Sequence, residues 1–204
     1  MFERVVVVHY HELGLKGRNR SVFERRLQSN LDAALVGLPV KRIERAASRL
    51  VVPVMDEAAA DTVASRCAQV AGVNSASPAY KTAQDMDEMQ RAALLALQEI
   101  DGPATFKVDA KRSNTEFATG SLDVNVAIGE FLRIESGLTV RLKSPDATVR
   151  LEIVQGAAYV YSRRFEGPGG LPTGTAGTVV SLLSAGLDSP VASWKIARRG
   201  AVVV

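Results

Sequence analysis

The chain has 204 residues, 47% of them hydrophobic, and a formal net charge of +3, so it can form one or two domains with buried cores. Its single cysteine excludes an intrachain disulfide framework. No 18-residue apolar run occurs and the N-terminus lacks a cleavable-signal pattern, so we expect a cytoplasmic protein without a membrane partner.

The first 80 residues alternate between strand and helix patterns. Short apolar runs indicate strands, and apolar residues at helical spacing indicate helices. The expected elements are a strand at 5–10, a helix at 22–35, strands at 40–47 and 49–54, a helix opening at Asp56 with Cys67 on its apolar face, and a weaker strand at 73–81. This βαββαβ order predicts a ferredoxin-like unit in an α+β protein.

A basic segment, HYHELGLKGRNR at 9–20, joins the first strand to the first helix. Its side chains suited to contact RNA phosphates are Lys16, Arg18, Asn19 and Arg20. His9 and His11 lie at the strand end, but only Glu12 accompanies them, so we predict no metal site.

Residues 81–166 show a second α/β pattern. A helix is expected at 85–100, a strand at 105–111, a further helix carrying Phe131 and Leu132, and strands at 148–154 and 157–163. Four basic residues are predicted to lie on loops of this region and to contact phosphates: Lys111, Arg112, Arg141 and Lys143.

The C-terminal segment follows a Gly/Pro-rich linker at 167–177 and reads as strand, loop, helix and second buried strand. Small residues in the loop let backbone N–H groups approach an anion, and the helix start adds donors. Ser189 suits the N-cap, Pro190 the first turn, and Trp194 and Ile196 suit helix packing. The predicted phosphate-binding residues are Leu183, Ser184, Ala185, Gly186, Leu187, Asp188 and Ser189.

This loop is not a Walker A sequence. The nearest approach, Gly169 to Gly174, is followed by Thr175 instead of the Lys that such loops need. Transfer of a γ-phosphoryl group is therefore disfavoured. An ordinary strand-to-helix turn is the alternative interpretation of the loop taken alone.

Charge is unevenly distributed along the chain. Residues 1–54 carry ten Lys/Arg against five Asp/Glu, whereas residues 55–104 carry three against eight. A basic N-terminal surface suits a phosphate-backbone partner. With only 5% aromatic residues, the chain is better suited to structured RNA than to stacking single strands.

Three motifs in the same order carry a family resemblance. Residues 9–20 resemble the RYGEIxLKGKNR stretch, with His9 and His11 at two substituted positions, and residues 81–166 resemble the RNA-binding THUMP domain. Residues 165–175 are similar to a linker, and 184–189 resemble the SGGxDS loop of PP-loop ATP pyrophosphatases, with Ala185 replacing the second glycine. The whole chain thus resembles the N-terminal part of the ThiI family of tRNA sulfurtransferases, the tRNA 4-thiouridine synthetases.

The resemblance implies a ferredoxin-like domain at 1–80, a THUMP domain at 81–166, a linker at 167–177 and a truncated, Rossmann-like PP-loop domain from 178 to 204. It implies an enzyme that binds tRNA, uses ATP and Mg²⁺ to adenylate uridine 8, and forms 4-thiouridine with persulfide sulfur from a cysteine desulfurase. Asp188 would be the essential side chain, holding Mg²⁺ or orienting the phosphates. A homodimer and a further role in thiamine biosynthesis are left open.

Two alternatives remain. One is a different PP-loop adenylating enzyme, of the lysidine or GMP synthetase type, which the first 165 residues disfavour. The other is a tRNA-binding THUMP module without catalysis. Because only one βαβ unit follows the linker, we expect this chain alone to bind tRNA but not to form 4-thiouridine.

Overall fold

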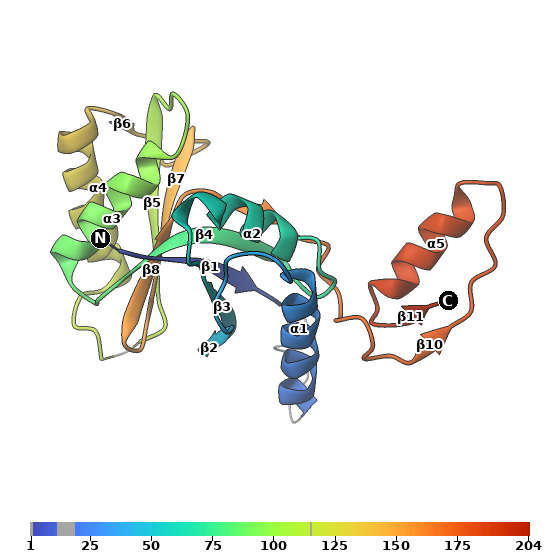
Figure 1. Cartoon of the computed structure of the whole chain (residues 1–204). Helices are drawn as coiled ribbons and strands as arrows, with labels where there is room; N and C mark the ends of the chain where they lie inside the picture. The colour runs from blue at the N-terminus through green and yellow to red at the C-terminus, as the bar shows by residue number, and fades with distance from the viewer. Residues whose placement is uncertain (1, 12–18, 115) are drawn as a thin grey trace. The chain divides into compact units, whose positions relative to one another are not determined.

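The computed structural model describes residues 2–11, 19–114 and 116–204 (Figure 1). The chain divides into two compact units, one formed by Met1–Val7 with Ser77–Arg164 and the other by Val8–Ala76 with Phe165–Val204. The boundary between them cuts through two strands, β1 (Glu3–His9) and β4 (Ser75–Thr82).

The first elements confirm the βαββαβ order. Between β1 and β4 lie α1 (Arg20–Ala34), β2 (Glu44–Ala46), β3 (Arg49–Pro53), the 3₁₀ turn η3 (Glu57–Ala59) and α2 (Ala60–Cys67). The strand order is β2-β3-β1-β4, with β2 and β3 antiparallel. Such an order is that of a ferredoxin-like sheet, as the sequence predicts.

Two local features set the helices of this region. Asp56 accepts a hydrogen bond from the Ala58 backbone N–H at 3.1 Å and so caps η3. Cys67 is buried on the apolar face of α2, which confirms its predicted place in the core, and burial raises the pKa of its thiol to about 12.

The strand expected at 40–47 is shorter than predicted, because only Glu44–Ala46 pairs as a strand and Val40 forms an isolated bridge with Val54.

The other unit contains a sheet covered by two helices. Its further elements are α3 (Met86–Gln98), β5 (Thr105–Arg112), α4 (Ser121–Ser136), β6 (Thr139–Val140), β7 (Ala147–Val154) and β8 (Ala157–Tyr161). The strand order is β4-β8-β7-β5-β6, with β5 parallel to both β6 and β7. Figure 1 shows α3 and α4 together on one side of β5, β7 and β8.

The apolar side chains of this sheet alternate as a half-buried sheet requires. Phe106, Leu151 and Val160 are fully buried in one core with Ile128 and Leu132 of α4. Alternate residues on the same strands, among them Lys107, Lys111 and Arg150, therefore lie on the sheet face opposite α3 and α4.

The last segment contains β9 (Phe165–Glu166), β10 (Thr178–Val179), α5 (Asp188–Ala197) and β11 (Val202–Val203). β9 pairs with Ser75 and Ala76 of β4, and β10 pairs in parallel with β11. This β10-α5-β11 order confirms the predicted βαβ beginning. Val202 and Val204 are 38% and 65% exposed, so the prediction that 201–204 form a buried strand is wrong except at Ala201.

The linker is bonded to structure on both sides. Gly167 and Gly169 donate to the carbonyl oxygens of Asn74 and Val73 at 2.9 and 2.7 Å, and Leu171 donates to Arg198 at 2.8 Å. Gly170 has φ +76°, and a Cβ there would lie 2.1 Å from the Arg198 oxygen, so only glycine fits.

Candidate nucleotide loop and nucleic-acid interface

The predicted phosphate loop lies between β10 and α5 and is closed by its own serines. The Ser184 backbone N–H donates to Ser189 Oγ at 2.9 Å, and the two hydroxyls lie 3.1 Å apart. Gly186 N–H donates to Ser184 Oγ at 3.3 Å. Residues 183–188 are exposed and Ser189 is half-buried, so the loop backbone is accessible to an anion that replaces these hydroxyls.

The loop backbone tolerates Ala185. Neither Ala185 nor Gly186 has a positive φ, and a Cβ at Gly186 would make only an ordinary 3.5 Å contact with Ser184 Oγ. The alanine that replaces the family glycine therefore imposes no left-handed strain in this conformation.

The start of α5 differs from the prediction. The helix begins at Asp188, its N-cap residue is Leu187, and no side chain caps it. Ser189 is not the N-cap because its hydroxyl is already bonded to Ser184 across the loop. Asp188 lies in the first turn and is exposed, where a carboxylate is favoured by the helix dipole and can reach solvent cations.

The outer face of α5 also differs from expectation. Trp194 and Ile196 are 53% and 42% exposed, so the prediction that they pack a helix is wrong for the described residues. Arg198 stacks over the Trp194 ring at 4.7 Å and donates to the Pro168 oxygen, which joins the helix end to the linker.

At the N-terminal basic segment, Lys16 and Arg18 lie outside the described residues. Asn19 is exposed at the N-cap of α1 and makes no side-chain capping bond. Arg20 Nε donates to Glu24 Oε1 at 2.7 Å, and Tyr10 donates to the same oxygen at 2.6 Å.

Burial and hydrogen bonds shift the pKa values of Tyr10 and Glu24 in this cluster. Burial alone would raise the pKa of Glu24, but hydrogen bonds from Tyr10 and Arg20 outweigh it and hold the pKa below its ordinary value. Burial, followed by the bond to Glu24, raises the pKa of Tyr10 to about 12. Glu24 was missed by sequence reasoning, although its i, i+4 spacing from Arg20 is a usable signal.

Lys111 and Arg112 end β5 and are therefore strand residues, not loop residues as predicted. Both are exposed. The Arg112 guanidinium donates to the Phe117 oxygen and, at 3.3 Å, to the Thr119 oxygen. Arg112 thus holds the backbone of the loop that follows β5. The partner of Lys111 in the strand register is Glu152 on β7.

Arg141 and Lys143 lie in the loop after β6, as predicted, and are exposed. Asp146 anchors this loop because its Oδ2 accepts bonds from Thr105 N–H and Oγ1, both at 2.8 Å, and from Ala104 N–H at 3.1 Å. These bonds, the Thr105 hydroxyl first, hold the pKa of Asp146 below its ordinary value.

The basic residues of this unit do not form one cluster. Arg141 N–H donates to Phe106 near the beginning of β5, whereas Lys111 and Arg112 lie at its end. At about 3.3 Å per residue, the two pairs are roughly 15–20 Å apart along the strand. They can contact different phosphates of an extended partner.

Within the described residues, no group of three or more His, Cys, Asp or Glu side chains could hold a metal ion. Over the same residues, no helix has the length and apolar character needed to cross a bilayer.

Comparison with known protein families gives three matches in chain order. Residues 5–77 match the ThiI ferredoxin-like domain, 83–163 the THUMP domain, and 174–204 the thiamine biosynthesis protein ThiI. A crystal structure from Pyrococcus horikoshii superposes with a TM-score of 0.88 at 33% identity, covering 98% of this chain and 67% of that one. The chain belongs to the ThiI family.

Further relatives support membership of the ThiI family. A probable tRNA sulfurtransferase of Macrococcus caseolyticus is 38% identical over 97% of this chain, and one of Moorella thermoacetica is 40% identical over 96%. The chain spans about half the length of these curated relatives. A 4-thiouridine synthetase crystallised with RNA and ATP superposes with a TM-score of 0.81 at 32% identity, covering 98% of this chain and 51% of that one.

Proposed function

We propose that this chain supplies the tRNA-binding domains and the ATP loop of a tRNA sulfurtransferase that converts uridine 8 to 4-thiouridine. The observation that carries the proposal is the order of three modules along one chain: the ferredoxin-like domain, the THUMP domain and the SAGLDS loop at 184–189. A relative with this architecture holds both RNA and ATP.

The proposed domain limits are 1–80, 81–166, a linker at 167–177, and the PP-loop segment from 178. RNA is bound by the first two domains. Phosphates are contacted by Lys16, Arg18, Asn19, Arg20, Lys111, Arg112, Arg141 and Lys143. The separation of the two basic pairs along β5 supports contact with an extended backbone.

The exposed loop at 183–189 fits a nucleotide phosphate. Its backbone N–H groups approach without strain at Ala185 and Gly186, and the Ser184 and Ser189 hydroxyls can turn from each other to the ligand. Asp188, at the first turn of α5, would hold Mg²⁺ or orient the phosphates.

ATP serves this reaction as a substrate. The carbonyl oxygen at C4 of uridine 8 bonds to the α-phosphorus and pyrophosphate leaves. The terminal sulfur of a persulfide, supplied through a cysteine desulfurase, then bonds to C4 and AMP leaves. A second thiol bonds to the inner sulfur, so the S–S bond to the transferred sulfur breaks, a disulfide forms and 4-thiouridine is released. The residues of this chain act on the first step by holding the RNA and the triphosphate together.

A second candidate is a tRNA-binding module without catalysis. The exposure of Trp194 and of several valines around β10 and β11 favours it, since the described part of the nucleotide sheet leaves these side chains in water. Under this function the chain would bind tRNA without binding ATP.

One experiment separates the two candidates. The chain and the whole protein are each incubated with tRNA, ATP, Mg²⁺, a cysteine desulfurase and cysteine, and pyrophosphate release is measured with and without tRNA. The proposed function predicts tRNA-dependent release by the whole protein. Binding of tRNA without release by the whole protein would support the non-catalytic module instead.

A further inference from the structure

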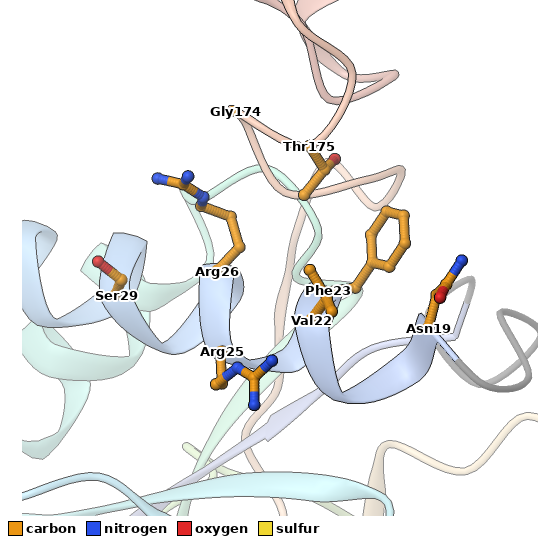
Figure 2. A pocket seen from close by; sticks show the side chains of 8 residues that line it. All are labelled: Asn19, Val22, Phe23, Arg25, Arg26, Ser29, Gly174 and Thr175. Atoms are coloured by element: carbon orange, nitrogen blue, oxygen red, sulfur yellow. The ribbon is translucent and has the colours of Figure 1, made fainter.

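A cavity of about 660 Å³ lies between α1 and the linker turn (Figure 2). It is lined by α1 residues from Asn19 to Ser29 and by Gly174 and Thr175. The turn is held against the helix because Asn30 Nδ2 donates to the Thr173 oxygen at 3.1 Å. It is also closed internally, since Thr175 Oγ1 donates to the Pro172 oxygen at 2.7 Å.

Arg26 supplies a cation to this cavity. Figure 2 shows its side chain directed toward Gly174, and a Cβ built on Gly174 would lie 3.3 Å from Arg26 Cζ. Within residues 2–11, 19–114 and 116–204, Arg26 makes no hydrogen bond or ion pair. The described residues that line the cavity include no carboxylate, and Glu24 of α1 is already bonded to Tyr10 and Arg20.

Phe23 supplies an aromatic surface beside the cation. Figure 2 places its ring on the same side of α1 as Thr175, and the side chain is only partly buried. Asn19 and Ser29 add an amide and a hydroxyl at the two ends of the cavity. A cation, an aromatic ring and neutral hydrogen-bonding groups suit one nucleotide, with the phosphate at Arg26 and the base at Phe23.

The charge of the cavity favours a phosphodiester over a free nucleotide. Arg25 also borders the cavity, but Figure 2 shows its guanidinium on the opposite side of the helix from Gly174. Among the described lining residues, Arg26 is the cation directed into the cavity, and one positive charge matches the single negative charge of a phosphodiester better than the several charges of a triphosphate. The volume lies within the range of small-molecule pockets.

We infer that this α1–linker cavity binds one nucleotide of the RNA substrate, with Arg26 on its phosphate and Phe23 stacked on its base. The inference rests on the proposed function for its partner but assigns a subsite separate from the loop at 184–189. Arg26 and Phe23 are then binding residues that none of the predicted basic segments includes.

The test compares variants of the complete chain in titrations of fluorescent tRNA at several salt concentrations. Arg26→Gln should weaken binding about tenfold, the scale of one charge-assisted hydrogen bond, and reduce the slope of log K against log salt by roughly 0.7 to 0.9. Arg26→Lys should keep the slope. Phe23→Leu should weaken binding about fivefold or more with the slope unchanged, because stacking releases no counterions.

Two controls complete the experiment. Arg91→Gln removes the same charge from an exposed position of α3, and Arg25→Gln removes the neighbouring guanidinium; both should change affinity less than Arg26→Gln. Equilibrium dialysis with AMP and with inorganic phosphate tests the free ligands. Arg26-dependent binding of AMP, with tRNA affinity unaffected by the substitutions, would overturn the RNA assignment.

The outcomes separate this inference from the proposed function. If the unmodified chain does not bind tRNA, the proposed function fails. If it binds tRNA and the Arg26 and Phe23 variants, folded by circular dichroism, match Arg91→Gln, the cavity inference alone is overturned.

Discussion

The Tyr10 hydroxyl donates a 2.6 Å hydrogen bond to Glu24 Oε1, the oxygen that also accepts from Arg20 Nε at 2.7 Å. Tyr10 directly follows β1 and Arg20 begins α1, so Glu24 ties together the two ends of the basic segment. Arg20 is bonded to Glu24 through Nε, which fixes the orientation of its guanidinium. The cluster thus presents the fork of Arg20 for a phosphate.

Replacing Glu24 should therefore affect both stability and RNA binding. Glu24→Ala removes the acceptor of the buried Tyr10 hydroxyl and should lower the free energy of unfolding by about 1–3 kcal/mol. It should also weaken tRNA binding by releasing Arg20, whereas Glu24→Gln should restore part of both effects. Urea unfolding and tRNA titration check this, and Glu24→Ala with unchanged tRNA affinity would remove Glu24 from the interface account.

The raised pKa of Tyr10 predicts a pH dependence at alkaline pH. Because the folded-state pKa of about 12 lies above the unfolded value near 10, the contribution of Tyr10 to stability is complete below pH 10. It is lost as the pH rises toward 12. The stability difference between the unmodified chain and Tyr10→Phe should thus shrink over that interval in urea unfolding. A constant difference from pH 8 to 12 would contradict the assignment.

Asp146 should support RNA binding from behind the loop that carries Arg141 and Lys143. Asp146→Ala removes three bonds to Ala104 and Thr105 and should weaken tRNA binding without itself losing a phosphate contact. Since its folded-state pKa is lowered, the anchoring is present above the unfolded value near 4 and is lost as the pH falls through the folded value. Asp123→Ala, an exposed carboxylate of α4, is the matched control; equal effects of the two variants on tRNA affinity would reject the anchor.

Replacing Lys111 and replacing Arg112 should have different effects, because Lys111 is proposed only to contact a phosphate, whereas Arg112 also holds the following loop. Lys111→Ala should reduce the salt slope by roughly 0.7 to 0.9 with stability unchanged. Arg112→Ala should in addition release the Phe117 and Thr119 carbonyl oxygens and increase proteolysis of the 113–120 loop. Salt titrations and limited proteolysis test the pair, and identical behaviour of the two variants would contradict the structure.

Sequence periodicity predicted most of the fold because it reports which residues of an element are buried. It identified the apolar faces that place Cys67 and Leu132 in cores, and the order of strands and helices in both α/β regions. It was wrong where the outcome depends on distant partners. Trp194 looks like a packing residue on its helix, but periodicity cannot tell what covers that helix.

The candidate site was likewise predictable in its residue types but not in the contacts that those residues make. Basic residues and the small-residue loop are visible in the sequence, but their local bonds are not. Ser189 has the chemistry of an N-cap, yet its hydroxyl pairs with Ser184 five residues earlier. Tyr10 lies 14 residues before Glu24, so the support for Arg20 is visible only once β1 and α1 are adjacent.

The central claim is that this chain supplies RNA binding through its first two domains and ATP chemistry through the loop at 184–189. Its most direct test is the near-ultraviolet absorbance of 4-thiouridine formed on tRNA by the whole protein, unmodified and with Asp188→Ala, with tRNA affinity measured on the same samples. The account predicts thiolation by the unmodified protein and none by Asp188→Ala, with tRNA affinity changed less than about twofold because no predicted RNA contact is removed. Normal thiolation by Asp188→Ala, or none by the unmodified protein, would contradict it.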